Sequence, residues 1–343
     1  MRIGIIVLIL LSFVSYSSDP RLTVLTDDAR LLLNDFNEMW AFPGTINKYQ
    51  FCSISSQADE GVGNGNEWWQ LGWFGGVINS AGTSWGAVYN HNQHILEVLY
   101  NPGSFGIIAG VDYLENETEG FGPTEITKDQ YSFSASFGTG LSFPFEYSDI
   151  SLGGEYNSVK YTAAETSLKI TDLQFNASLR GHMDHSFFNL FPVFSADFSR
   201  LDMQDSTIIT TISADLGIAT NRMIAQETRL IAGAFIGVNN SSPEDGDNVL
   251  ILNLVHIKAG IEQRINNWLL IRAGANSLTN RFKDGEKDAV VSTRISSRFG
   301  VGFEISNFSL DAGISEGFLH NGPYMIGGSP EGFLGHLSCT YYF

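Results

Sequence analysis

Residues Tyr131–Phe143, YSFSASFGTGLSF, alternate without a break between two kinds of side chain. Every second position holds one of Tyr131, Phe133, Ala135, Phe137, Thr139, Leu141 and Phe143, with serine or glycine between them. A period of two is the repeat of a β-strand, and no helix explains it. About ten such residues, tilted by about 45°, rise roughly 23 Å, close to the height of the apolar band of a membrane barrel.

Similar alternating runs recur about every 20 residues from residue 48 onward. We expect strands at 48–57, 68–78, 84–91, 94–100, 104–114, 129–142, 147–159, 167–181, 189–201, 207–220, 224–238, 249–264, 269–278, 289–305, 308–316 and 332–343. The run 94–100 has the weakest pattern, and merging it with a neighbour would lower the count. The predicted fold is all-β, a transmembrane antiparallel up-and-down barrel of about 14 to 16 strands.

The connections between these runs alternate in length toward the C-terminus. Residues 317–331, 279–288 and 239–248 are long connections, whereas 306–307, 265–268 and 221–223 are short ones. Long external loops and short periplasmic turns are typical of outer-membrane barrels. The sequence therefore favours the outer membrane of a diderm, Gram-negative bacterium.

The composition agrees with a barrel and excludes other classes. Charged residues make up 16% of the 343 residues, against about 25% in soluble domains. The 36 glycines, 25 phenylalanines and only 9 prolines suit many strands with aromatic belts. The net charge of −18 argues against nucleic acid as a partner. No segment after the N-terminal region is apolar enough for a transmembrane helix, which excludes a helical membrane protein.

The N-terminal region divides into two parts. Arg2 precedes a short apolar run, Ile5–Val14, and small residues follow at Ser15–Ser17, the pattern of a secretory signal peptide. We expect residues 1–17 to be this signal, 18–47 a periplasmic or lumenal segment without alternation, and 48–343 the barrel.

Hairpin register assigns one face of the strands to the lumen. A two-residue turn at Ser306–Asn307 pairs apolar with apolar and polar with polar residues. A three-residue turn at Asn266–Trp268 places Glu262 opposite Arg272. We expect an ion pair there, so that Glu262→Ala would leave Arg272 unpaired. Because alternate residues of a strand face the same side, the following charged residues are expected to face the lumen: Arg180, Arg229, Glu262, Arg264, Arg272, Arg294, Arg298 and Glu304. They either line a water-filled pore or form a paired network that plugs a narrow one.

We find no pattern that predicts catalysis, a metal site or a cofactor. His182 and His185 would point to opposite faces of a strand, and nucleophile-elbow and dinucleotide fingerprints are absent. The protein is therefore not expected to be an enzyme. Cys52 and Cys339 fall in the first and last strands, which are neighbours in a closed barrel. They either form a disulfide or remain two free thiols.

Several segments carry a family resemblance: Ile257–Glu262, Trp268–Gly274, Phe299–Phe303, Phe308–Gly313 and Thr340–Phe343. Through them, residues 249–343 resemble the superfamily of bacterial outer-membrane barrels that includes FadL-type hydrophobic-compound transporters and PorV-like barrels. Asp35–Gly44 is similar in placement to the N-terminal segment of that family.

The resemblance implies a passive channel or transporter for a small molecule, including a hydrophobic one, with the lumen plugged by the N-terminus. The alternative is a non-transporting scaffold or secretion-associated barrel of the PorV-like kind. It also implies that Tyr341 and Phe343 form a C-terminal assembly signal. The expected partners are outer-membrane lipid, the barrel-assembly machinery and an unidentified small-molecule solute.

Overall fold

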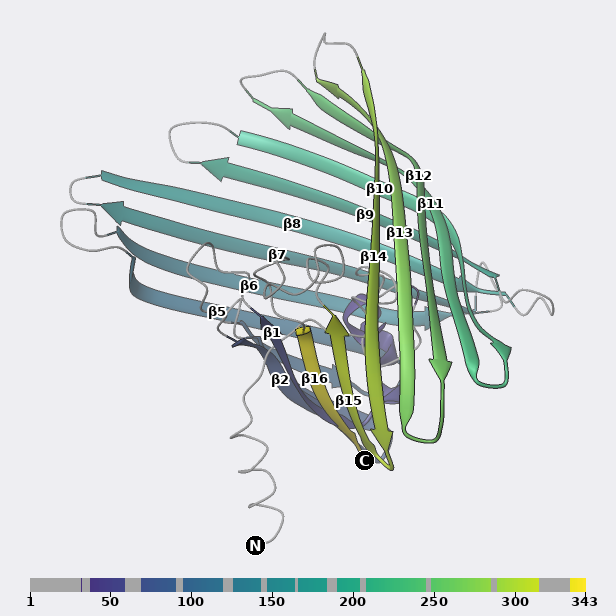
Figure 1. The fold of residues 1–343 in the computed structure, drawn as a ribbon. Coiled ribbons are helices and arrows are strands. Elements are labelled where there is room, and N and C mark those ends of the chain that lie inside the picture. The colour runs from purple at the N-terminus through teal and green to yellow at the C-terminus, as the bar shows by residue number, and fades with distance from the viewer. Residues whose placement is uncertain are drawn as a thin grey trace, which may run out of the picture.

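Sixteen antiparallel strands close into one barrel (Figure 1). The computed structural model describes Leu32 and residues 38–58, 69–90, 95–119, 126–142, 147–163, 166–183, 190–203, 208–244, 248–284, 289–314 and 334–343. The strands are β1 (Phe51–Ala58), β2 (Trp69–Ser80), β3 (Thr83–Asn90), β4 (Ile95–Asn101), β5 (Phe105–Glu119), β6 (Ile126–Leu141), β7 (Tyr147–Ala163), β8 (Thr166–His182), β9 (Leu190–Met203), β10 (Ile208–Ala225), β11 (Thr228–Pro243), β12 (Val249–Arg264), β13 (Leu269–Asp284), β14 (Val290–Ile305), β15 (Phe308–Ile314) and β16 (Leu334–Tyr342).

Each strand pairs with its neighbours in sequence, and β1 closes the barrel on β16. The predicted all-β barrel is confirmed at the upper end of its strand count, and the weak run 94–100 is β4. The register predicted for two hairpins is confirmed, because Glu304 lies opposite Ser309 and Glu262 lies opposite Arg272. Several strands run further than predicted, such as β13, which continues to Asp284.

The outer face of the barrel is apolar. On β6, Phe133 is 57% exposed and Phe137 43%, whereas Ser132, which points to the other face of the same strand, is buried. Other large apolar side chains exposed on the outside include Ile107, Val111, Leu152, Phe175, Phe194, Leu216, Ile218, Ile236 and Ile257. Exposure of so many apolar side chains would be costly in water and is the expected arrangement against lipid. The chain therefore has the architecture of an outer-membrane β-barrel.

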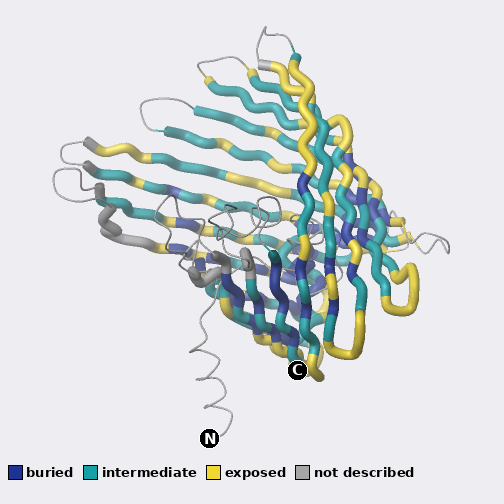
Figure 2. Tube along the Cα trace, in the orientation of Figure 1, coloured by how far each residue is buried: buried dark blue, intermediate teal, exposed yellow. Residues whose placement is uncertain are grey.

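The wall of the barrel is uneven in height. The strands β5–β14 are 14 to 18 residues long, whereas β1–β4, β15 and β16 have 7 to 12. Tight turns such as Ala81–Gly82 and Ser306–Asn307 join strands at one end, which we call the short-turn end. Figure 2 shows buried residues gathered in the lower parts of the strands around β1, β15 and β16.

Two short helices, α3 (Glu38–Ala41) and η1 (Pro43–Lys48), precede β1 and lie within the barrel (Figure 1). Among the described residues, no helix combines the length and the apolar character needed to cross a bilayer. At the β1–β16 seam, Cys52 lies opposite Tyr341 and Cys339 opposite Ile54. Both cysteines are free thiols in the structure.

Candidate functional site

Residues Glu38–Tyr49, here called the plug segment, form a unit with its own hydrogen bonds. The amide of Phe42 donates to the Glu38 carbonyl at 2.7 Å, and the amide of Thr45 donates to the Phe42 carbonyl at 2.9 Å. The Thr45 hydroxyl also donates to the Phe42 carbonyl. At the end of η1, the Tyr49 amide donates to the Ile46 carbonyl at 3.2 Å. These bonds satisfy backbone groups that would otherwise be orphaned at the ends of such short helices.

The plug segment lies at the short-turn end of the lumen. The side-chain amide of Asn47 donates to the carbonyl of Gly103, which is in the turn between β4 and β5. Asn79, near the turn that ends β2, donates to the Asn47 carbonyl at 3.3 Å. The plug therefore occupies the end of the barrel at which the short connections lie.

One side of the plug segment packs on an apolar wall. Met39 and Ile46 of the plug are fully buried. They belong to a cluster with inward side chains from β1 to β5: Phe51, Val77, Val88, Leu99 and Ile108. Fully burying one such aliphatic side chain contributes about 1.5–3 kcal/mol, so this contact, here called the apolar seat, is a stable one.

Glycines in β5 and β6 allow the plug backbone to approach the wall. A Cβ atom on Gly106 would lie 1.7 Å from the Pro43 carbonyl oxygen, and one on Gly138 would lie 2.7 Å from Pro43 Cδ. Nearby, the side-chain amide of Asn101 donates to the Gly44 carbonyl at 3.0 Å. Any larger residue at position 106 would therefore have to displace the plug.

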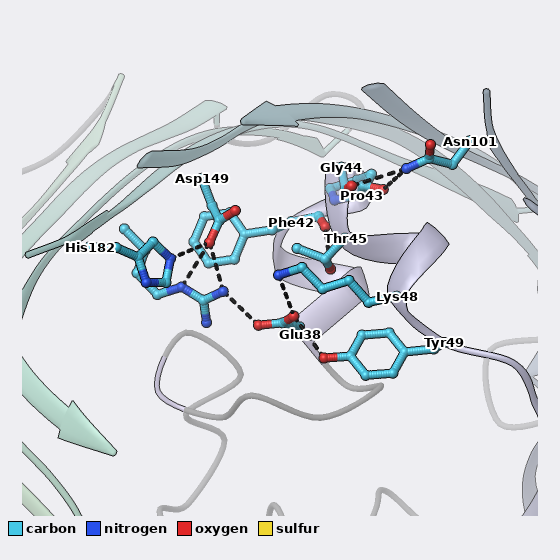
Figure 3. A network of polar contacts seen from close by, with 11 residues as sticks. Glu38, Phe42, Pro43, Gly44, Thr45, Lys48, Tyr49, Asn101, Asp149 and His182 are labelled. Carbon is cyan, nitrogen blue, oxygen red and sulfur yellow. Dashed lines mark hydrogen bonds and ion pairs between the residues drawn. The ribbon is translucent and has the colours of Figure 1, made fainter. Parts of the chain in front are cut away.

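The opposite side of the plug is held by charge (Figure 3). Arg180 Nη2 on β8 lies 2.5 Å from Glu38 Oε2 of the plug and 2.7 Å from Asp149 Oδ2 on β7. The side chains of Arg180, Glu38 and Asp149 are only 0%, 1% and 2% exposed. The guanidinium carbon also lies 4.7 Å from the centre of the Phe42 ring, a cation–π distance. We call this contact the ionic seat.

Each carboxylate of the ionic seat has a further partner on its own side. On the wall, His182 Nε2 lies 2.7 Å from Asp149 Oδ2. On the plug, Lys48 Nζ and the Tyr49 hydroxyl donate to Glu38 Oε1 at 3.1 and 2.7 Å. Buried carboxylates need such partners, since unpaired burial of charge is costly.

A second charged cluster lies on β12–β15 and includes the predicted pair. Glu262 Oε2 accepts from Arg272 Nε at 2.7 Å, and Arg272 Nη1 also donates to Asp311 Oδ1. The Ser309 hydroxyl donates to the other oxygen of Asp311 at 3.1 Å. Gly302 leaves room, since a Cβ there would meet Arg272 Nη1 at 2.7 Å. The expectation that Arg272 depends on Glu262 alone is wrong, because Asp311 is a second partner.

The remaining predicted residues are spread over the wall. Arg264 Nη2 pairs with Glu304, and Arg229 lies opposite Glu262 in the β11–β12 register. On β14, Arg294 is exposed and Arg298 is partly buried. The structure thus brings Glu262 and Arg272 together, and Arg264 and Glu304, but places Arg180 in a different cluster.

His182 borders the ionic seat through Asp149, whereas Tyr341 and Phe343 lie at the β1–β16 seam. Tyr341 and Phe343 are exposed, with ring centres 5.4 Å apart. Their predicted role in assembly remains a prediction. His182 contacts Asp149 and the rings of Tyr147 and Phe191. Within the described residues no cluster of three or more His, Cys, Asp or Glu residues could hold a metal, while His185 lies outside them.

Besides Glu262, which was predicted, these two clusters contain three carboxylates that sequence reasoning missed. Asp149 and Asp311 occupy inward-facing alternate positions of their strands, as Arg180 and Arg272 do. Counting alternate positions for every carboxylate in the strands would therefore have found them. Glu38 lies outside all alternating runs and gave no comparable signal.

A second apolar patch lines the inside of β9–β11. It contains Leu32 of the N-terminal region and the wall residues Phe191, Val193, Ala219, Ile231 and Phe235. Asn221 on β10 donates to the Leu32 carbonyl at 3.0 Å. The ring of Phe235 lies over Gly217 and Gly233, where a Cβ would meet it at 2.2 and 2.7 Å. This part of the inner wall is therefore apolar, and it is buried in one cluster with Leu32.

No protein-family model and no curated protein matches this chain. Solved structures similar to it include a FadL homologue of Pseudomonas aeruginosa, with 11% identity, a TM-score of 0.45, and coverage of 96% of this chain and 98% of that one. Another is CdiB from Acinetobacter baumannii, with 9% identity, a TM-score of 0.44 and coverage of 86% and 60%. A third is the FrpB iron transporter from Neisseria meningitidis, with 12% identity, a TM-score of 0.41 and coverage of 77% and 46%.

The chain thus spans less than two thirds of the length of CdiB and FrpB. At these identities the likeness is one of barrel architecture and does not extend to substrates or partners.

Proposed function

We propose that this protein is an outer-membrane channel for small molecules, closed at its short-turn end by the plug segment and opened when that segment moves. The observation that carries the proposal is the ionic seat: a noncovalent contact between Glu38 of the plug and Arg180 of the barrel wall. A buried ion pair adds little net stability compared with apolar packing, and its best-attested use is in registry and switching. The plug can therefore act as a gate.

The passage of hydrophobic molecules is supported by the inner wall itself. A water-filled pore is usually lined by polar side chains, yet Phe191, Ile231 and Phe235 face inward on β9–β11. These side chains are buried with Leu32 in the closed state, and once uncovered they would favour solutes that lose little on leaving water. The proposal thus includes small hydrophobic solutes and assigns no catalytic role to the protein.

The proposal places the protein in the outer membrane of a Gram-negative bacterium, exported by a signal peptide at residues 1–17. Lipid would surround the apolar outer face, and the barrel-assembly machinery would read the exposed aromatic residues Tyr341 and Phe343. Cell fractionation, with heat-modifiable mobility on a detergent gel, tests both the location and the folded barrel.

The alternative is a scaffold or secretion-associated barrel that passes no solute. The cluster of Glu262, Arg272 and Asp311 favours it, because this cluster is buried and fully paired within the wall. If such charge pairs fix the wall and the plug does not move, the barrel passes no solute and instead offers partner proteins a rigid binding surface.

Conductance in planar bilayers separates the two. If the plug is a gate, purified protein carrying Glu38→Gln or Arg180→Met passes more current in KCl than the wild type, and liposomes containing it swell faster in arabinose. Glu227→Gln, at a half-exposed residue of the β10–β11 turn, is the control and behaves as wild type. Correctly folded variants that never conduct and never swell liposomes would favour the scaffold.

A further inference from the structure

We propose that the ionic seat is a latch built for release, in which Asp149 and Lys48 weaken the docking of the plug rather than strengthen it. The inference rests on the proposed function, since it describes how the same gate is regulated. Glu38 and Arg180 make the docking contact itself. Asp149 and Lys48 set how readily it opens.

The two halves of the ionic seat are each balanced in charge. When the plug leaves, Arg180 keeps two hydrogen bonds to Asp149, at 2.7 and 3.1 Å. Glu38 keeps Lys48 and Tyr49, which belong to the plug and move with it. Each half is then neutral by itself, so undocking leaves no uncompensated charge in the lumen. The large cost of breaking a buried pair arises mainly from such an uncompensated charge.

Charged neighbours compete with the docking contact between Glu38 and Arg180. Glu38 Oε2 and Asp149 Oδ2 accept from the same nitrogen, Arg180 Nη2, at 2.5 and 2.7 Å. Two carboxylates that share one donor repel each other and divide its attraction. On the plug side, Lys48 competes with Arg180 for the carboxylate of Glu38. Both neighbours therefore lower the free energy of docking that Glu38 and Arg180 would have alone.

The apolar seat differs from the ionic seat in how it responds to water. Met39 and Ile46 lose their burial if they leave β1–β5, because water offers them no compensation. Charged groups regain hydration when they separate. The ionic seat on β7–β8 therefore breaks first. The plug segment stays packed on β1–β5, close to Tyr49, where the chain leads into β1. Solute would pass between the plug and β7–β8.

A cysteine reporter on β7 tests this directly. Ser151 is 4% exposed and lies opposite Gly138, the glycine that faces Pro43 of the plug. With Cys52 and Cys339 replaced by serine, Ser151→Cys is the only thiol. Its rate of modification by a water-soluble methanethiosulfonate reports how often the plug leaves β7–β8.

The two pairs of substitutions should change the rate of cysteine modification in opposite directions. Glu38→Gln and Arg180→Met speed the modification by about tenfold, since each removes a charge-assisted bond of the docked state. Asp149→Asn slows it by about tenfold, and Lys48→Met by about twofold, because Lys48 is half-exposed and screened by solvent. Glu227→Gln leaves the rate unchanged.

If the four residues only stabilise the docked plug, all four substitutions should raise the rate at which the cysteine at position 151 is modified. Faster modification, or an unchanged rate, in both Asp149→Asn and Lys48→Met would overturn the latch. Heat-modifiable mobility checks folding, and if Asp149→Asn fails to fold, Lys48→Met decides alone.

Conductance of the same variants separates the latch from the channel. Opposite labelling shifts without any current would uphold the latch and reject the channel. Current that rises in Glu38→Gln, with labelling that is faster in every variant, would uphold the channel and reject the latch.

Discussion

Arg180 and Glu38 are 142 residues apart in the sequence, yet Arg180 Nη2 and Glu38 Oε2 lie 2.5 Å apart inside the barrel. The contact joins a strand of the wall to a segment that precedes the first strand. It fixes one side of the plug by charge, while Met39 and Ile46 fix the other by apolar packing. The plug is thus held by two contacts that respond differently to water, and this difference is the basis of the proposed gate.

Glu262→Ala should destabilise the barrel only moderately, by about 1–3 kcal/mol. Arg272 keeps Asp311 as a partner after this change, so its charge remains compensated. Replacing both Glu262 and Asp311 by alanine should cost more, about 3–5 kcal/mol, because the buried guanidinium then loses both of these carboxylates. Urea unfolding in detergent micelles, followed by tryptophan fluorescence, measures both. Equal midpoints for the single and double variants would contradict the three-residue cluster.

Gly106→Ala should displace the plug without unfolding the barrel. A Cβ at this position would lie 1.7 Å from the carbonyl oxygen of Pro43, a contact that requires the backbone to move. We expect higher conductance and faster modification of a cysteine at position 151. Gly154→Ala is the matched control, because its Cβ would meet the Phe175 ring at 3.2 Å and the Gln174 carbonyl oxygen at 3.5 Å, and no atom of the plug is among these nearest atoms. A Gly106→Ala protein with wild-type conductance would show that the plug does not limit passage.

Phe133→Arg should impair insertion, since Phe133 points outward from β6 and is 57% exposed. An arginine near the bilayer midplane costs about 2–4 kcal/mol in such barrels. Phe133→Ala, which adds no charge, should cost less. Folding into liposomes across a urea series measures both variants. Should the arginine variant fold as readily as the alanine variant, residue 133 does not face lipid.

Deletion of Phe343 should lower the amount of protein in the outer membrane. Phe343 is exposed and packs against Tyr341, where assembly machinery could read both rings. Its loss removes little buried area, so the purified protein should keep its unfolding midpoint. Immunoblots of outer-membrane fractions test the prediction, with Phe343→Tyr as the conservative control. Equal levels of the truncated and full-length proteins would argue against a terminal signal.

Alternation predicted the strands, their register and their two faces with few errors. The Glu262–Arg272 pairing followed from one short turn, since a hairpin fixes which residues oppose each other. The second partner of Arg272 escaped this reasoning. Asp311 comes from β15, beyond the intervening strand β14, and reaches Arg272 across the position left open by Gly302.

The sequence by itself determined the barrel, because a period of two is a local property and lipid outside the wall selects one face of every strand. Only the tertiary structure decided what fills the lumen. The closed barrel brings Arg180 and Asp149 of the wall into one cluster with Glu38 of the plug. Residue 38 belongs to no repeating pattern, so its partner depends on the closed ring of strands and not on its neighbours in the chain.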